Sequence, residues 1–334
     1  MAGLVETMAY AHKDKVTTGS DKSSGAYQTP WHGLGVPVRN DLTPAQMQKK
    51  AGLDWTVDRY PSFIEIENSK GEMEKMNAGK DVLVRSTDKK ILTHISEGWE
   101  PVQNDQAFEF FAEFVSAGHM EMNTAGSLRG GKMVWALAKT GESFDAVKGD
   151  AVDSYLLFSN PHEYGTRIDI RFTAIRVVCN NTLTLALNTQ ADQVVRVNHC
   201  KKFDPDMVKK TLGLSHSNTE NYKEMAHFIS KKKFTVDALV DYYKTVFPLT
   251  GKGGKEGEDK LSRAAQTCFD NLDTQPGSKF AKGSWWQAYN SVTYSIDHVL
   301  GHSQETRLAS SWYGPNRQKK ITALEKAVEY ANAS

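Results

Sequence analysis

The chain has 334 residues, of which 39% are hydrophobic and 24% are charged, and its formal net charge is +1. These values are typical of a soluble globular protein with one large or two modest cores. No run approaches the roughly 20 consecutive apolar residues of a membrane span, and the N-terminus lacks the basic and apolar segments of a signal peptide. We therefore expect no membrane association.

The small net charge conceals an uneven distribution of charged side chains. Residues 54–124 carry 14 acidic against 7 basic side chains, whereas residues 167–233 carry 12 basic against 6 acidic ones. One interpretation is that the two segments neutralise each other or simply solvate the surface. The other is an anion-binding surface built by residues 167–233, with the acidic segment making it selective.

The chain has three widely spaced cysteines: Cys179, Cys200 and Cys268. Three separated thiols do not form a disulfide framework, so they indicate a reducing compartment. We expect the protein in the cytoplasm.

The N-terminal residues 1–25 are polar and lack periodicity, which predicts a flexible arm. Residues 26–203 alternate between strand-like and helix-like patterns and predict an α+β core. Residues 204–334 are mostly helical in pattern. The predicted fold class is therefore α+β, an antiparallel sheet with a long β-hairpin packed by helices and a helical C-terminal region.

The first part of the core begins with an ordered loop at Trp31–Val38 and a short helix from Thr43 to Lys50. Pro44 stands at the first helical position, and Gly52 ends the helix. Strand-like alternation follows over residues 55–66 and 81–85, and the segment 68–80 between them is predicted to be a charged turn.

A helix and a hairpin come next. Asn104 or Asp105 caps an amphipathic helix that Gly118 ends. Residues 120–139 are predicted to form two strands joined by the Gly-rich turn at residues 129–132, which reads Arg-Gly-Gly-Lys.

The segment 167–187 changes its period in the middle. After a strand at 152–159, Ile168, Ile170 and Phe172 alternate with polar residues, which predicts a half-buried strand over 166–172. Beyond Thr173 the apolar residues recur at helical spacing, which predicts a helix with Thr173 as its N-cap. Its polar face would carry Arg176, Asn180 and Thr184, side chains that suit a phosphate or another anion.

Beyond residue 204 the apolar spacing predicts a series of helices with a Gly-rich charged loop at 250–259. Thr235 is the predicted N-cap of one of them. The predicted helices cover residues 205–214, 219–230, 236–247, 261–271, 284–300 and 321–331.

Several sequence motifs occur in one order along nearly the whole chain, from about residue 26 to residue 331. The motifs are WHGLGVPV (Trp31–Val38), AGLDW (Ala51–Trp55), EPVQND (Glu100–Asp105), GSLRGGKMVWALAK (Gly126–Lys139), RVVCNNTL (176–183) and WWQAYNSVTYSIDH (Trp285–His298). Together they resemble the phage- and plasmid-like family known as domain of unknown function 932, which implies a mobile genetic element in a bacterial host but no established chemistry.

The predicted order of helix, hairpin, strand pair and helix is also similar, in topology alone, to the core of Rad52-like single-strand annealing proteins. That resemblance implies a long β-hairpin and a further strand packed against a crossing helix.

Catalytic and metal-binding patterns are weak. Residues 251–255 are glycines and lysines without the spacing of a phosphate loop. His199, Cys200, His216 and Cys179 are not arranged in the paired spacings of a zinc site, and Cys179 lies on the apolar side of its predicted helix. We therefore predict no catalytic residue, no metal ligand and no cofactor.

Basic and aromatic side chains give the predicted site. Two glycines at the tip of the predicted hairpin allow the backbone of a nucleic acid to approach closely. Tyr164 lies in an exposed turn where it could stack on a base. For Trp135 we favour core packing, and the lysines of 231–233 are equally well explained as a solvated face. The predicted nucleic-acid-binding residues are Arg129, Lys132, Tyr164, Arg167, Arg171, Arg176, Asn180, Arg196, Lys201 and Lys202.

These observations predict binding and annealing of single-stranded DNA in phage recombination or replication, without covalent chemistry. The expected partners are single-stranded DNA, further copies of the chain in a homo-oligomer, and an exonuclease or single-strand binding protein of the phage. One alternative is a structural or host-interaction protein that forms a homo-oligomer, and another is a metal-dependent nuclease.

The aromatic pair Trp285-Trp286 leaves two interpretations open. The pair could form a subunit contact, in which case alanine at both positions would lower the assembly state. It could instead pack in the core, in which case the same change would unfold the chain. Trp31 and His32 have no derivable chemistry.

Overall fold

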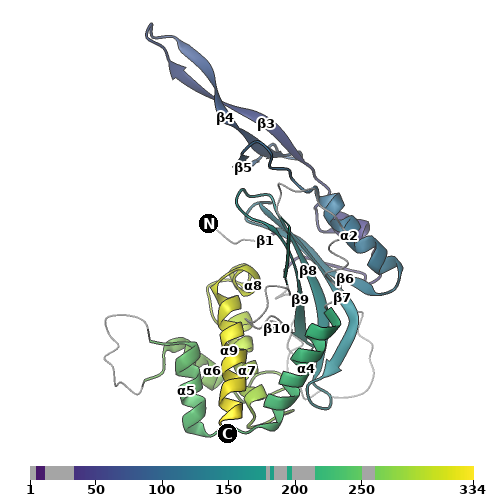
Figure 1. Cartoon of the computed structure of the whole chain (residues 1–334), viewed down its shortest axis with the longest axis vertical. Helices are drawn as coiled ribbons and strands as arrows, with labels where there is room; N and C mark the ends of the chain where they lie inside the picture. Colours follow the sequence, from purple (N-terminus) through teal and green to yellow (C-terminus); the bar gives the residue numbers. More distant parts are fainter. Residues whose placement is uncertain (1–4, 12–33, 178–180, 184–193, 198–214, 250–259) are drawn as a thin grey trace.

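A computed structural model of the protein describes residues 5–11, 34–177, 181–183, 194–197, 215–249 and 260–334. The fold is α+β, as predicted. A large sheet carries helices on both faces, and a smaller three-stranded sheet extends from one end of it (Figure 1). The C-terminal part is helical. Within the described residues, no helix is both long and apolar enough to cross a bilayer.

Helix α1 (Pro44–Lys50) begins and ends where the sequence predicts, whereas α2 (Asn104–Ser116) already includes both predicted caps, Asn104 and Asp105, as its first two residues. In α1 the N-cap Thr43 forms a capping box with Gln46, so two backbone N–H groups gain acceptors. Helix α2 is followed by Gly118, whose φ of 73° lies in the left-handed region that glycine favours.

The large sheet has the strand order β10-β9-β8-β7-β6-β1-β2, and β11 also pairs with β9. Every pair is antiparallel except β1 with β2. The predicted hairpin is β6 with β7, joined through residues 129–132, and the predicted strands β8 and β9 follow it in the same sheet. The strands are β1 (Val5–Ala11), β2 (Val36–Val38), β6 (Met120–Leu128), β7 (Met133–Asp145), β8 (Ala151–Pro161), β9 (Ile168–Arg176), β10 (Asn181–Leu183) and β11 (Val194–Val197).

Strand β1 corrects the prediction of a flexible arm over residues 1–25, which is wrong for residues 5–11. The strand lies between β6 and β2, with Met8 and Ala9 buried on opposite faces. A β-carbon at Gly126 of β6 would lie 2.5 Å from the Thr7 carbonyl oxygen, so the close approach of β1 requires glycine there. Pairing with two distant segments, which no local pattern reveals, makes these residues a strand.

Strand β9 corrects the prediction of a helix from Thr173, because the strand continues to Arg176 and β10 pairs with its end. The alternation breaks because the second face of the sheet is also covered. Ile175 packs there beneath α8 (Gln304–Tyr313), so the end of β9 is apolar on both sides. A strand buried on both faces loses its period of two, and the sequence pattern then imitates a helix.

The first half of β9 follows the prediction. Ile168, Ile170 and Phe172 are buried together on one face of the sheet. Arg171 lies on the other face, and Arg167, just before the strand, is exposed. The prediction for residues 168–172 is confirmed.

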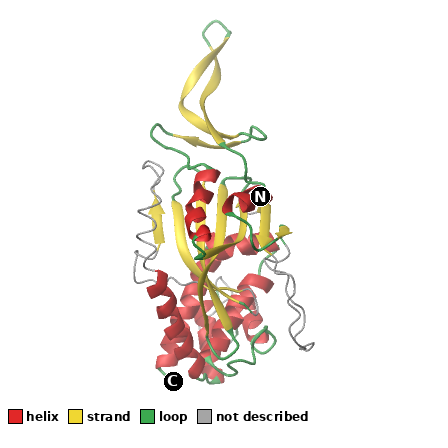
Figure 2. Ribbon diagram, turned by 90° about the vertical axis from the view of Figure 1, so that its right-hand side faces the viewer, coloured by secondary structure: helices red, strands yellow, loops and turns green. Residues whose placement is uncertain are grey.

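The smaller sheet consists of β3 (Val57–Glu67), β4 (Met73–Arg85) and β5 (Ile91–Ile95). The predicted turn over 68–80 is too long, since only residues 68–72 turn and β4 begins at Met73. The two strands therefore form an extended hairpin that projects away from the rest of the molecule in two perpendicular views (Figures 1 and 2). The charged composition of 68–80 hid the strand because both faces of this hairpin meet solvent.

The C-terminal region confirms most of the predicted helices, including the N-cap at Thr235. Helix α8 was not predicted, and α9 begins before the predicted start at residue 321. The predictions for 205–214 and 250–259 lie outside the described residues. The helices are α4 (Ser215–Lys231), α5 (Val236–Val246), α6 (Arg263–Asp270), α7 (Trp285–Tyr294) with the π-helical turn η3 (Ser295–Val299), α8 (Gln304–Tyr313) and α9 (Pro315–Asn332).

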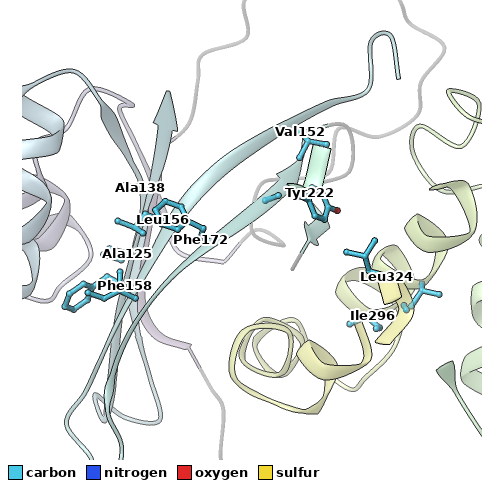
Figure 3. Close-up of a cluster of buried hydrophobic side chains, with 14 of the residues drawn as sticks. Ala125, Ala138, Val152, Leu156, Phe158, Phe172, Tyr222, Ile296 and Leu324 are labelled. Carbon is cyan, nitrogen blue, oxygen red and sulfur yellow. The ribbon is translucent and has the colours of Figure 1, made fainter. Parts of the chain in front are cut away.

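One hydrophobic core extends from the sheet into the helical region. Figure 3 shows side chains of this core from the sheet, such as Phe158 and Val152, and from the helices, such as Tyr222 and Leu324. A second, smaller core lies on the other face of the sheet, where the ring of Trp135 meets Trp312 of α8 edge-on at 4.8 Å between centroids. The packing of Trp135 in the core is confirmed, while the predicted division of the chain at residues 203 and 204 stays a prediction.

Trp285 and Trp286 at the start of α7 both belong to the large core, where each is at most 1% exposed. Trp285 packs against Phe234, Tyr242 and Tyr330, with ring centroids 5.2–5.8 Å apart. Of the two interpretations of this pair, the structure supports core packing.

A buried ion pair connects the sheet to the helical region. The Arg176 guanidinium donates to both carboxylate oxygens of Asp150, at 2.7 and 2.8 Å, and to the carbonyl oxygens of Pro276 and Gly277. The indole N–H of Trp286 donates to the same carboxylate at 2.8 Å. Because both charges are almost completely buried, each depends on these bonds to offset its desolvation.

We predict that Arg176→Met lowers the free energy of unfolding by about 3–5 kcal/mol, because it leaves the Asp150 carboxylate buried without its counter-charge. Urea denaturation followed by circular dichroism measures the change. Arg39→Met, which removes an exposed ion pair with Asp41, is the matched control and should cost at most about 1 kcal/mol. An equal, small loss in both variants would contradict the role assigned to the buried pair.

Cys268 gives a second prediction. Burial raises the pKa of its thiol to about 12, so in the folded protein the reactive thiolate is scarce at neutral pH. We expect iodoacetamide at pH 8 to modify Cys268 only after denaturant is added, with peptide mass spectrometry locating the label. Labelling of Cys268 in native buffer at the rate of a free cysteine would contradict this assignment.

Candidate nucleic-acid interface

Three segments far apart in the sequence meet at the end of the large sheet from which the smaller sheet extends. They are the β6–β7 turn at 129–132, the β8–β9 connection at 162–167 and the β4–β5 turn at 86–90. The His162 N–H donates to the Lys132 carbonyl oxygen at 2.7 Å, which ties the first two segments together. We call these side chains of the three segments the basic rim: the cations Lys89, Lys90, Arg129, Lys132 and Arg167, and the aromatic Tyr164.

The β6–β7 turn has an unusual backbone. Arg129, Gly130 and Gly131 all have positive φ, at 56°, 68° and 87°. A β-carbon at Gly130 would collide with the Lys90 ammonium nitrogen, and one at Gly131 would lie 2.8 Å from Nη1 of Arg85. The two glycines therefore let Arg85 at the end of β4 and Lys90 of the β4–β5 turn lie directly against the hairpin tip.

Arg129 is the one rim cation with an ion-pair partner among the described residues. Its guanidinium lies 3.1 Å from the carboxylate of Glu163, and both side chains are partly exposed. An exposed pair of this kind contributes little to stability and can exchange one anion for another. Lys89, Lys90, Lys132 and Arg167 make no ion pair within the described residues.

Arg85 holds the β4–β5 turn in place. Its guanidinium donates to both carboxylate oxygens of Glu6 on β1 and to both of Asp88, at 2.6–2.9 Å. The bonds from Arg85 lower the pKa of Asp88 well below its usual range. The carboxylates of Glu6 and Asp88 are thus already occupied by Arg85, and β1 is connected to the smaller sheet.

Tyr164 is the exposed aromatic side chain of the rim, with 52% of its surface accessible. Its hydroxyl group accepts a hydrogen bond from Ser96 at 3.2 Å, and its backbone N–H donates to Thr93 at 3.3 Å. These two bonds, to Thr93 within β5 and to Ser96 just after it, fix the position of Tyr164. Such a ring is suited to stacking on an unpaired base.

Arg171 is close to the rim in sequence but is covered by α8. Its side chain pairs with Asp169 at 2.6 Å, donates to the Trp312 carbonyl oxygen at 3.1 Å and lies over the ring of Tyr313. The prediction that Arg171 contacts nucleic acid is therefore wrong for this arrangement, because its hydrogen bonds and surroundings attach α8 to the sheet.

Arg176 corrects the prediction in the same way. It lies near the opposite end of the sheet and is 1% exposed, so the buried bonds with Asp150 leave no surface for a ligand. Asn180, Lys201 and Lys202 lie outside the described residues. The backbone of Arg196 in β11 is paired with Asp169 of β9. Of the ten predicted binding residues, the rim unites Arg129, Lys132, Tyr164 and Arg167.

Sequence reasoning missed Lys89 and Lys90. The run Thr-Asp-Lys-Lys at residues 87–90 is a clear turn signal, and Lys89 has a positive φ of 58°. Nothing local indicates, however, that this turn lies beside the hairpin tip. A search for lysine-bearing turns would have found the pair without its location.

Among the described residues, no group of three or more histidine, cysteine and acidic side chains could hold a metal ion. Of the residues for which the sequence predicts no zinc site, His199, Cys200 and Cys179 lie outside the described residues. The rim itself contains cations, an aromatic ring and backbone N–H groups. This combination can bind an anion, and it contains no nucleophile paired with a general base.

Comparison with known proteins gives one family match. A family model described as Domain of unknown function (DUF932) matches residues 91–324, which includes the β6–β7 turn, the β8–β9 connection and most of the helical region. Neither curated proteins nor solved structures include a match to the chain. The topological similarity to Rad52-like proteins remains a prediction. That similarity requires a crossing helix to begin at residues 173–176, whereas the strand β9 occupies these residues.

The Arg85 contacts predict a local effect of mutation. Arg85→Gln should lower the free energy of unfolding by about 1–3 kcal/mol, since hydrogen bonds to charged groups are lost. Trypsin should then cleave after Lys89 or Lys90 faster than in the wild type, because the turn is no longer held against β1. Arg39→Gln is the control, and unchanged cleavage at 89–90 in Arg85→Gln would contradict the assignment.

Proposed function

The chain belongs to the DUF932 family, a domain of unknown function, and we propose that it binds single-stranded DNA at the basic rim. The observation that carries the proposal is the convergence of five cations from three separate turns around one exposed tyrosine. Cations that lack acidic partners attract phosphates, and an exposed ring stacks on bases of any sequence.

The rim favours a single strand over a duplex. Its one aromatic platform, Tyr164, can contact a base face only where the base is unstacked from its neighbours. The glycines at the hairpin tip allow a sugar-phosphate backbone to approach the peptide backbone closely. Among the described residues, the rim itself consists of turns and carries no helix that would enter the major groove of a duplex.

Annealing follows from such binding without a covalent step. Neutralised phosphates repel a complementary strand less, and bases that face away from the protein can pair. In this proposal the protein acts in phage recombination or replication in the bacterial cytoplasm, next to an exonuclease or single-strand binding protein.

The test measures binding of a fluorescent single-stranded oligonucleotide by anisotropy. We expect tight binding at ~50 mM salt and a loss of orders of magnitude by ~200 mM, because cations released from the DNA drive association. Lys90→Ala with Lys132→Ala should lower the slope of log affinity against log salt by about 1.4, roughly 0.7 for each phosphate contact.

The matched control is Lys148→Ala with Lys279→Ala. Lys148 is exposed in the β7–β8 turn, at the end of the sheet opposite the β6–β7 turn, and Lys279 is exposed on a neighbouring loop. This variant loses the same formal charge away from the rim, so its slope should stay near that of the wild type. Equal losses in the two variants, or no binding by micromolar wild-type protein at low salt, would contradict the proposal.

Tyr164→Ala provides an independent measurement. If the ring stacks on a base, its removal should weaken binding by about 1–3 kcal/mol without changing the salt slope. Tyr164→Phe, which keeps the ring but loses the Ser96 bond, should retain most of the affinity.

A further inference from the structure

The outer part of the β3–β4 hairpin projects from the main body and packs against no other element of the described residues. We call residues 60–80 the β3–β4 arm; both views show it extending away from the other elements (Figures 1 and 2). Six of the 14 large exposed hydrophobic side chains of the described residues lie on it: Tyr60, Phe63, Ile64, Ile66, Met73 and Met76. An isolated two-stranded ribbon is marginally stable in water, so this arm is suited to binding another surface.

The register of the arm divides its side chains between two faces. Ile64 is opposite Met76, and Ile66 follows on the same face, which is therefore largely apolar. The other face carries Phe63, Glu65 and Lys75, with the Lys75 ammonium 4.5 Å from the centre of the Phe63 ring. Neither face is covered by another element of the described residues.

The turn shows which backbone groups are free. The Asn68 N–H donates to the Glu72 carbonyl oxygen at 2.8 Å, so residues 68 and 72 form a hydrogen-bonded pair. Hydrogen-bonded and open pairs alternate along an antiparallel ladder. The pairs of Phe63 with Asn77, Glu65 with Lys75 and Glu67 with Met73 are therefore open, and their N–H and C=O groups point outward from both edges.

Within the described residues these edges have no strand partner. On β4, strand β5 pairs only with residues 81–84, which leaves residues 73–80 open. On β3, the outer edge is occupied only near its base, where Gln103 bonds to both backbone groups of Val57. Two unpaired strand edges on one projecting hairpin favour aggregation, unless each edge pairs with a specific strand of another molecule.

The charges identify the partner. On the outer edge of β3 the outward residues include Glu65 and Glu67, and on that of β4 they include Lys75. Residues 61–80 carry four acidic and three basic side chains, so the arm has no excess of positive charge to attract nucleic acid. If the register within the hairpin is repeated between copies, Glu65 of one copy lies opposite Lys75 of the next, and Ile64 lies beside Met76 of the next.

We infer that the β3–β4 arm is an assembly element, in which the outer edge of β3 pairs with the outer edge of β4 of a second copy. The contact joins two different edges, so it is heterologous and builds a ring or a filament. It does not depend on the proposed DNA binding, since the arm and the basic rim share no residues.

Sedimentation velocity of the full chain, with charge reversals at the arm, tests this inference. The wild type should sediment as an assembly, whereas Glu65→Lys alone and Lys75→Glu alone should each shift it towards the monomer, because like charges then face each other between copies. Lys70→Glu, which reverses an exposed charge in the turn outside this register, is the matched control and should leave the assembly intact.

Mixing the two single variants separates assembly from a defect within the hairpin. In an equimolar mixture the two variants can alternate along the assembly. Each contact then joins opposite charges again, so the assembly should return. Within a single hairpin, by contrast, the like charges at positions 65 and 75 remain after mixing. If the single variants lose the assembly and mixing does not restore it, the loss comes from a defect within the hairpin and the inference is overturned.

Two other outcomes would also overturn it. One is a wild type that stays monomeric at every concentration tested. The other is a single reversal that leaves the assembly unchanged. If the wild type is monomeric and the arm variants lose affinity for single-stranded DNA, the arm is instead a nucleic-acid contact. Circular dichroism of each variant confirms that the fold is retained.

Discussion

The buried pair of Arg176 and Asp150 is the contact on which the arrangement of sheet and helices depends. Arg176 is the last residue of β9, and Asp150 precedes β8, so the pair lies at the end of the sheet facing the helical region. The loop carbonyl groups of Pro276 and Gly277 and the indole of Trp286 complete its hydrogen bonds. A buried charge pair is tolerable only when its remaining donors and acceptors are satisfied. Sheet, loop and helix must therefore meet in one geometry.

This requirement decides which cations of the basic segment are available for binding. Charges on the strand itself become structural where helices cover the sheet, as with Arg176 at one end and Arg171 beneath α8. Charges on the turns at the opposite end, such as Lys89, Lys90 and Arg167, stay exposed, because no helix of the described residues covers them. The same amino-acid type thus takes two different roles, and the covering of the strand by helices determines which one.

The β3–β4 arm follows the opposite physical rule. The large sheet buries its apolar side chains between helices and gains stability from a close-packed interior. The arm leaves apolar side chains and outward backbone groups in solvent, which is costly for an isolated hairpin. The Arg85 bonds to Glu6 and Asp88 hold the base of this hairpin to β1, so the exposed part projects from a firmly anchored position.

The local features of the chain were predictable from sequence because they depend on neighbours along the chain. The cap at Thr43, the stop at Gly118, the hairpin turn at 129–132 and the cap at Thr235 all arise within a few residues. The family resemblance and the α+β class also followed from ordered motifs and periodicity.

Tertiary structure alone decided the remaining features. Strand β1, the pairing of the end of β9 with β8 and the position of Lys90 against Gly130 each require contacts between segments tens of residues apart. A short segment becomes a strand when distant partners supply its hydrogen bonds, and a strand loses its alternation when both faces are covered. Sequence periodicity records how one segment is solvated on average, whereas the folded chain determines which surfaces water reaches.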